Sequence, residues 1–270
     1  MRMLAAGVMA LLLASPCLAQ TTPSPKDEAR IVVEGTTPDV KNLPVTTQTT
    51  TFSEEKAASA VGISEARRFL RCAHQIDGKL LHNIVDHGGR DTKSRWALDR
   101  LIRQRSACHG SMYADPPPQA PFYGMCNPIG ALCQSVFDRG VLFEYALGTF
   151  APDLQLTRSD LQRREVRQRF LQHDLPKVRL RYPEDQRYLD IVSCVVQLRP
   201  EESLELIRLP EKSPKEDRLR ALLVASVPAC FGNAKKVTLD PNQFRVYVAE
   251  AIYNWAVAAK GVDSLVPGRS

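Results

Sequence analysis

The chain reads RFLRCAHQI at residues 68–76 and DIVSCVVQL at residues 190–198. In both stretches apolar residues recur at the spacing of an amphipathic helix, and the cysteine lies on the stripe expected to face the core. A second cysteine follows 36 positions after each. We therefore expect an all-α protein of two similar disulfide-stapled helical units, produced by internal duplication. The expected disulfides are Cys72–Cys108 and Cys194–Cys230.

The signals that begin helices also recur. Residues 91–94 (DTKS) and 213–216 (SPKE) lie 122 positions apart, and each begins with a residue type that caps helices. Asp240-Pro241 has a similar form and precedes a last helix, whose expected counterpart covers residues 136–147. Only six of the 37 positions from 72 to 108 are identical at the 122-residue offset, so the alternative is an ordinary helical domain with coincidental cysteine spacing.

Changes in composition give the expected boundaries. Residues 1–19 have the form of a signal peptide, because Arg2 precedes an apolar run and small residues stand before a cleavage point after Ala19. The Thr/Pro-rich residues 20–52 are expected to be a disordered linker, and residues 263–270 a disordered tail. The helical part divides into unit 1 at 53–150 with a Pro/Cys loop insertion at 113–135, a connecting segment at 151–182, and unit 2 at 183–262.

Export to the periplasm or beyond determines the expected state of the cysteines. Cleavage after residue 19 removes Cys17 and leaves six cysteines, an even number suited to disulfides. We expect the remaining pair, Cys126 and Cys133, to form a bridge that closes the insertion. The alternative for this pair is a redox motif, which requires closer spacing. Lipidation is the alternative for Cys17, although Pro16 before it departs from the usual pattern.

Composition restricts the class of partner. The net charge is +6, with 36 basic and 30 acidic side chains interleaved rather than gathered into a nucleic-acid-binding patch. No later apolar stretch has the length of a transmembrane span. Residues 31–35 (IVVEG) resemble a segment near the mature start of TonB-dependent receptors, which implies a bacterial source but no activity. The expected partner is an unidentified protein or envelope component, with no cofactor and with the oligomeric state left open.

Residues 157–171 are expected to form a connecting helix. Thr157 and Asp160 have the spacing of a capping box. The arginines of this segment are Arg158, Arg163, Arg164, Arg167 and Arg169. We interpret them first as a solvated helix face with ion pairs between residues four apart. The alternative is a site for anionic partners such as phospholipid head groups.

Two glutamates are the candidate functional residues. Arg139-x4-Glu144 and Arg245-x4-Glu250 occupy equivalent places in the last expected helix of each unit, among apolar residues. A carboxylate there must pair with a cation, reach water or hold a proton, because unpaired burial is costly. We expect structural ion pairs, and hence a non-catalytic interaction or envelope-associated module. The alternative is an envelope hydrolase of glycan or cell-wall substrates, with Glu144 and Glu250 as general acid and base.

His82 and Asp86 are the weak candidates for a metal site. They are four residues apart and can share a helix face, as zinc ligands do. The favoured interpretation is a helix end with histidines near its C-terminus, where positive charge is stabilised. We therefore expect no metal site.

Overall fold

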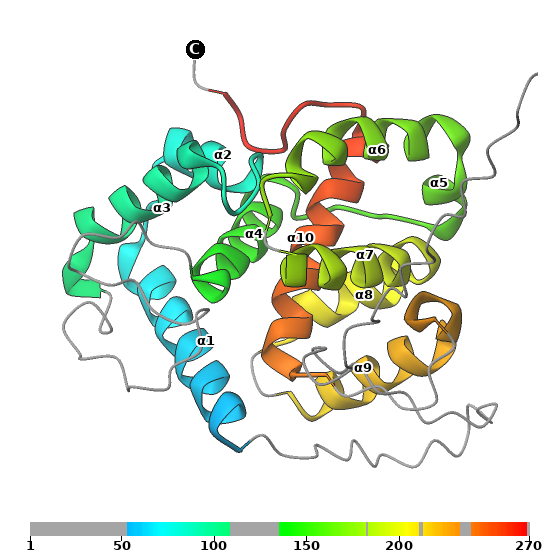
Figure 1. Ribbon diagram of the computed structural model, residues 1–270, viewed down its shortest axis with the longest axis horizontal. Coiled ribbons are helices and arrows are strands. Elements are labelled where there is room, and N and C mark those ends of the chain that lie inside the picture. Colours follow the sequence, from blue (N-terminus) through cyan, green and yellow to red (C-terminus); the bar gives the residue numbers. More distant parts are fainter. Residues whose placement is uncertain (1–52, 109–134, 182, 211–212, 233–238, 269–270) are drawn as a thin grey trace, which may run out of the picture.

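The computed structural model describes residues 53–108, 135–181, 183–210, 213–232 and 239–268 (Figure 1). These residues form ten α-helices and two short 3-10 helices, and no strand lies within them. The all-α prediction is confirmed for this part of the chain. Among the helices found there, none combines the length and the apolar character that a membrane span requires. The predicted signal peptide, linker and Cys126–Cys133 bridge lie outside the described residues.

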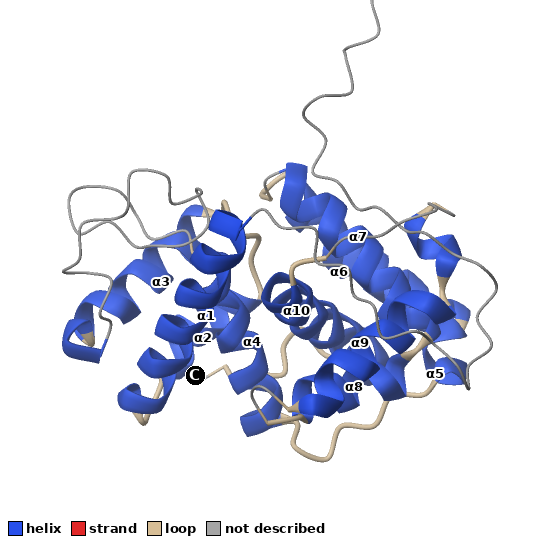
Figure 2. Cartoon of the chain, turned by 90° about the horizontal axis from the view of Figure 1, so that it is seen from below, coloured by secondary structure: helices blue, strands red, loops and turns tan. Residues whose placement is uncertain are grey.

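The boundaries expected from the sequence sort the helices into a first group, a connection and a second group. The first group is α1 (Ser53–Ala73), α2 (Gly78–Val85), α3 (Thr92–Gln104), η1 (Ser106–Cys108) and α4 (Val136–Phe150). The connection is α5 (Arg158–Gln162) and α6 (Arg164–Val178). The second group is α7 (Pro183–Leu198), α8 (Pro200–Arg208), α9 (Pro214–Ser226), η3 (Pro228–Phe231) and α10 (Pro241–Lys260). Figures 1 and 2 show α1 to α3 on one side and α5 to α9 on the other, with α4 and α10 running between them.

Four of the ten helices begin at the predicted capping residues. Asp91, Ser213 and Asp240 cap α3, α9 and α10, because each side chain accepts a hydrogen bond from a backbone N–H two or three residues later. Thr157 and Asp160 form the predicted capping box at the start of α5. These caps satisfy N–H groups that have no partner within the helix, and so set where each helix starts.

The end of α1 differs from the prediction. The helical pattern around residues 68–76 predicts a helix that continues to Gly78, but α1 ends at Ala73 because His74 adopts a left-handed backbone conformation, with φ of 48°. Gly78 instead begins α2. Cys72 is consequently exposed near the end of α1, and the expectation that it faces the core is wrong.

The predicted connecting helix over residues 157–171 is broken in two. Arg163 has a non-helical ψ of 134° and separates α5 from α6. In one continuous helix Leu161 would point well away from Val166 and Phe170, since successive residues are about 100° apart. The break allows all three side chains to be buried in the core.

Both predicted disulfides of the described chain are present. Cys72–Cys108 links α1 to η1, and Cys194–Cys230 links α7 to η3, with Cα–Cα distances of 5.5 and 5.6 Å. Each bridge fixes the end of a long helix to the segment that follows the third helix of its group. By restricting the unfolded chain, each is expected to stabilise the fold by about 2–4 kcal/mol.

The two groups of helices have corresponding bounds and neighbours. α3 and α9 begin at residues 92 and 214 and are equally long, so both their ends lie 122 positions apart. α2 and α8 also begin 122 positions apart, at residues 78 and 200. In the first group α1 packs on α4, and α2 packs on α3 and α4. In the second group α7 packs on α10, and α8 packs on α9 and α10.

α10 forms the centre of the core. All its residues from Phe244 to Ala258 are buried, and it packs on α4, α6, α7 and α8. α4 approaches it closely at Gly140, where a Cβ atom would overlap the side chain of Val246. Three polar residues of α10, Arg245, Glu250 and Asn254, are buried as well and therefore need hydrogen-bonding partners.

Candidate functional site

Glu144 and Glu250 lie on the paired helices α4 and α10, and each is bound by an arginine of the other helix. Arg139 of α4 donates to Glu250 at 2.6 Å. Arg245 of α10 donates to both oxygens of Glu144, at 2.9 and 3.3 Å. The ion pairs therefore cross between the two groups of helices, a choice of partner that the sequence motifs did not reveal.

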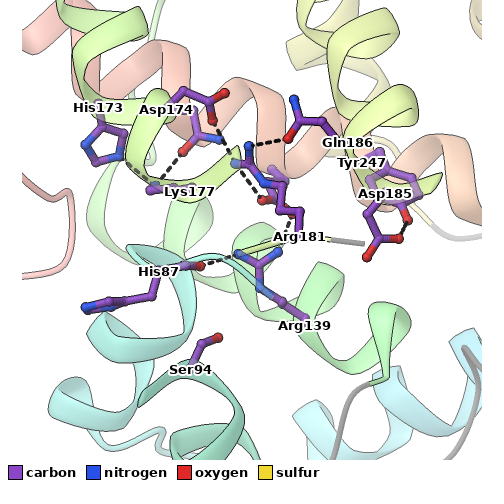
Figure 3. A network of polar contacts seen from close by, with 12 residues as sticks. His87, Ser94, Arg139, His173, Asp174, Lys177, Arg181, Asp185, Gln186 and Tyr247 are labelled. Atoms are coloured by element: carbon purple, nitrogen blue, oxygen red, sulfur yellow. Dashed lines mark hydrogen bonds and ion pairs between the residues drawn. The ribbon is translucent and has the colours of Figure 1, made fainter. Parts of the chain in front are cut away.

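Each of these arginines also binds the end of a neighbouring helix. Arg139 Nη2 donates to the backbone oxygen of His87, at 2.7 Å, just after α2 (Figure 3). Arg245 Nη2 donates to the backbone oxygens of Ile207 and Leu209, at 2.9 and 3.0 Å, at the end of α8. His87 and Leu209 lie 122 positions apart. Helix ends leave carbonyl groups unpaired and favour a cation, so each guanidinium ties three segments together.

Glu144 lies in the more open of the two pairs. Its side chain is 18% exposed, and Arg67 lies 3.9 Å from it. Arg245 lies between Glu144 and Glu216, whose carboxylate is 3.3 Å from Nη1. Burial alone would lower the pKa of Arg245, but the charges and hydrogen bonds of Glu144 and Glu216 outweigh it and raise that pKa.

Glu250 lies in the more buried pair, with 5% of its side chain exposed. Arg139 binds its Oε2, and Arg181 lies 3.5 Å from its Oε1. Arg181 also donates to Asp174 at 2.7 Å and to Gln186 at 3.0 Å (Figure 3). Burial opposes the charge of Arg181, but Glu250 and Asp174 raise its pKa overall. Both carboxylate oxygens of Glu250 are thus held by guanidinium groups.

A buried lysine lies beside this pair. Lys177 Nζ donates to Asn254 Oδ1 at 3.1 Å and contacts His173 Nε2 at 2.8 Å (Figure 3). Burial lowers the pKa of Lys177 to about 8, against the charges of Asp86 and Glu250, which raise it. Burial and the charge of Lys177 lower the pKa of His173 to about 4. The imidazole is therefore neutral at pH 7 and accepts a hydrogen bond from the ammonium group.

The two metal candidates meet at the end of α2. His82 Nδ1 lies 3.7 Å from Asp86 Oδ2. The carboxylate of Asp86 also accepts hydrogen bonds from Tyr253, at 2.9 Å, and Ser264, at 2.7 Å. Burial raises the pKa of Asp86, opposed by the hydrogen bond from Ser264 and the charge of Lys177. Within the described ranges, no three His, Cys, Asp or Glu side chains are grouped to hold a metal ion.

The arrangement around Glu250 holds charges in fixed pairs. Its cations are Arg139, Lys177 and Arg181, and its carboxylates are Asp86, Asp174 and Glu250. Guanidinium groups occupy both carboxylate oxygens of Glu250, which leaves neither oxygen free for a substrate. A substrate would also have to displace two arginines from a side chain that is 5% exposed. These contacts favour a structural role for Glu250.

Lys177, Arg181 and Asn254 also belong to this cluster, although the sequence patterns did not indicate them. A signal was present, because Glu250 and Asn254 lie four residues apart and interrupt the apolar stretch of residues 246–259. Lys177 and Arg181 are also four residues apart, in the last turn of α6 and just after its end. Only the packing of α6 on α10 shows that the two polar pairs meet.

Comparison with known proteins identifies no relative of this chain. No protein-family model, no curated protein and no solved structure matches it. Its function is therefore inferred from the geometry and chemistry of its own residues.

Proposed function

We propose that this protein is an exported, non-catalytic helical interaction module in which Glu144 and Glu250 hold two similar units together. The crossing of the two ion pairs carries this proposal. Each glutamate is bound by an arginine of the other unit, and each arginine also binds a helix end of its own unit. Carboxylates occupied in this way act as contacts between units and not as a general acid and base.

Duplication of one ancestral unit explains why the contacts correspond. The two disulfides each span 36 positions, and the carbonyl groups bound by Arg139 and Arg245 lie 122 positions apart. The arginines themselves lie 106 positions apart. A 16-residue insertion before Arg139 accounts for the difference, since 31 positions separate it from Cys108 and 15 separate Arg245 from Cys230.

The N-terminal sequence and the disulfides support export. Residues 1–19 have the charge, apolar run and small residues of a signal peptide. Structural disulfides such as Cys72–Cys108 persist in oxidising compartments and are rare in the cytosol. The periplasm or the exterior of a bacterial cell is the compartment proposed for the mature chain.

The substitutions Glu144→Gln and Glu250→Gln test the non-catalytic role. Both keep the shape of the side chain and remove its charge. We expect each variant to unfold at lower urea concentration than the wild type, and we expect neither the wild type nor the variants to release soluble fragments from purified cell wall. Glu202→Gln is the matched control, because Glu202 pairs with Arg199 at the surface. The role would be refuted by a wild type that releases fragments and two stable variants that do not.

A further inference from the structure

The outer face of α6 carries a pair of exposed leucines. Leu171 is 54% exposed and Leu175 is 62% exposed. They are four residues apart on one helix and therefore lie side by side. Val166, Phe170 and Lys177 of the same helix are buried, so the leucines belong to the face directed away from the core. Single exposed apolar residues are ordinary, but an adjacent pair on one helix face is typical of a contact surface.

Arginines flank the two leucines. Arg164 and Arg167 precede Leu171 by seven and four residues, and Arg179 follows Leu175 by four. Helical spacing places these residues on or beside the leucine face. All three arginines are exposed, and none forms a salt bridge with a carboxylate of the described residues.

The carboxylates of α6 do not neutralise this face. Glu165 lies 3.8 Å from Arg163, which precedes the helix. Asp174 points inward and binds Arg181 at 2.7 Å. The outer face of α6 is therefore positively charged as well as apolar. α6 lies at an outer edge of the molecule (Figure 1), and Leu171 and Leu175 are exposed there.

From this geometry we infer that the outer face of α6 docks on a lipid bilayer that contains anionic phospholipids. Leu171 and Leu175 would enter the interface between head groups and acyl chains, as the apolar side of a surface-lying helix does. Arg164, Arg167 and Arg179 would bind the phosphate groups, for which the guanidinium fork is suited. The other exposed residues of α6 are Glu165, Gln168, Gln172 and Pro176, so the helix offers no exposed aromatic ring on which a nucleic-acid base stacks. This inference rests on the proposed function, because an exported module meets the envelope bilayer.

Vesicle co-sedimentation tests the docking. Protein produced by bacterial expression of the full chain is mixed with vesicles of phosphatidylcholine alone or of phosphatidylcholine and phosphatidylglycerol in equal parts. We expect binding to the anionic vesicles, and weaker binding at high salt because ions screen the arginines. Leu171→Gln/Leu175→Gln and Arg164→Gln/Arg167→Gln should each weaken vesicle partitioning by about tenfold or more.

Matched controls remove the same chemistry from other helices. Val61→Gln removes an apolar side chain of α1 that is 48% exposed. Arg187→Gln/Arg218→Gln removes two exposed arginines, from α7 and α9. We expect both controls to bind vesicles as the wild type does. Thermal unfolding should be unchanged in all of these variants, since the substituted side chains are exposed. If the double leucine variant fails to fold, Leu175→Gln alone provides the comparison.

Three results would overturn the docking. The first is no preference for anionic vesicles, and the second is equal loss of binding in the α6 variants and the controls. The third is a solution dimer that the leucine variant converts to a monomer, because the face would then be covered by a second copy. None of these results would affect the proposed roles of Glu144 and Glu250, which urea denaturation tests separately.

Discussion

Glu250 and Glu144 differ in how much positive charge is left without a carboxylate partner when the glutamate is substituted. Glu250 is bound by Arg139 and Arg181 at a site where 5% of its side chain is exposed. Glu144 is 18% exposed, and its partner Arg245 keeps a second carboxylate in Glu216. Removing the Glu250 charge therefore leaves two buried guanidinium groups less compensated, which is the costly case.

We predict that Glu250→Gln lowers the free energy of unfolding by about 3 kcal/mol. Glu144→Gln should cost less, about 1–2 kcal/mol, because water and Glu216 compensate Arg245. Urea denaturation at pH 7 measures both changes, with Glu202→Gln expected to stay within about 0.5 kcal/mol of the wild type. Equal, small losses for both buried-pair variants would contradict the assigned difference in burial.

Because of Lys177, the free energy of unfolding depends on pH in the alkaline range. Its pKa is about 8 in the folded protein and 10.5 in an unperturbed lysine. Between these values the unfolded chain holds a proton that the folded chain lacks, so stability rises with pH. Tyr247 and Tyr253 act in the opposite direction, because burial raises their pKa values above the usual 10.0. Their effect begins near pH 10, which confines the rise to about pH 8–10.

We predict that the free energy of unfolding increases on the order of 2 kcal/mol between pH 8 and pH 10. Lys177→Met should remove this increase, because no group at that position titrates. Lys79→Met, at an exposed position of α2, should retain it. Guanidinium denaturation at several pH values provides the measurement. An increase of the same size in the Lys177→Met protein would show that another group is responsible.

Between helices, the close approach of α4 to α10 depends on the missing side chain of Gly140. A Cβ atom there would overlap Val246, whereas a Cβ atom at Gly148, later in the same helix, would meet nothing within 4 Å. Glycine is otherwise unfavourable within a helix, by about 1 kcal/mol relative to alanine. At Gly140, close packing of the two helices therefore outweighs the higher helix propensity of alanine. At Gly148 no such packing opposes that propensity.

We predict opposite outcomes for alanine at these two glycines. Gly140→Ala should lower the free energy of unfolding by about 1–3 kcal/mol, because overpacking forces the helices apart. Gly148→Ala should raise it by about 0.5–1 kcal/mol through helix propensity. Thermal unfolding of both variants, followed by circular dichroism, measures the two changes. Stabilisation by both substitutions would mean that α4 and α10 are not in close contact at Gly140.

The expected bridge between Cys126 and Cys133 lies outside the described residues and stays a prediction. With Cys72–Cys108 and Cys194–Cys230 formed, and with Cys17 removed by the proposed signal-peptide cleavage, these two are the cysteines left over. Peptide mapping without reduction should recover a fragment that contains both. A fragment linking either of them to one of the other four cysteines would contradict the pairing.

Much of the helical framework could be predicted because its signals are local. Caps such as Asp91 and Ser213 act on the next few residues. The two disulfides, each spanning 36 positions, were indicated by the matched cysteine spacing. The break at Arg163 could not be predicted in this way, since it depends on directing Leu161 and Phe170 into one core. Capping residues therefore predict where helices begin, whereas packing in the core determines where a helix is interrupted.

Which side chains pair in the candidate site depends on how helices that are distant in sequence pack together. The sequence indicated Arg139, Glu144, Arg245 and Glu250 as related residues. It did not indicate that the pairs cross, because this follows from how α4 packs on α10. Lys177 lies in the buried stripe of a helix whose outer face also carries leucines, so the apolar pattern of α6 gave no clear orientation. The deciding hydrogen bonds join residues more than 100 positions apart in the chain, so patterns within one helix could not reveal them.

For the protein as a whole, we propose that the crossed ion pairs join two similar units. Double-mutant cycles test it most directly, with Arg→Gln and Glu→Gln substitutions and urea denaturation. We predict coupling energies of about 1–3 kcal/mol for Arg139 with Glu250 and for Arg245 with Glu144. The pairs within one helix, Arg139 with Glu144 and Arg245 with Glu250, should couple by less than about 0.5 kcal/mol. Stronger coupling within each helix than between the helices would contradict the claim.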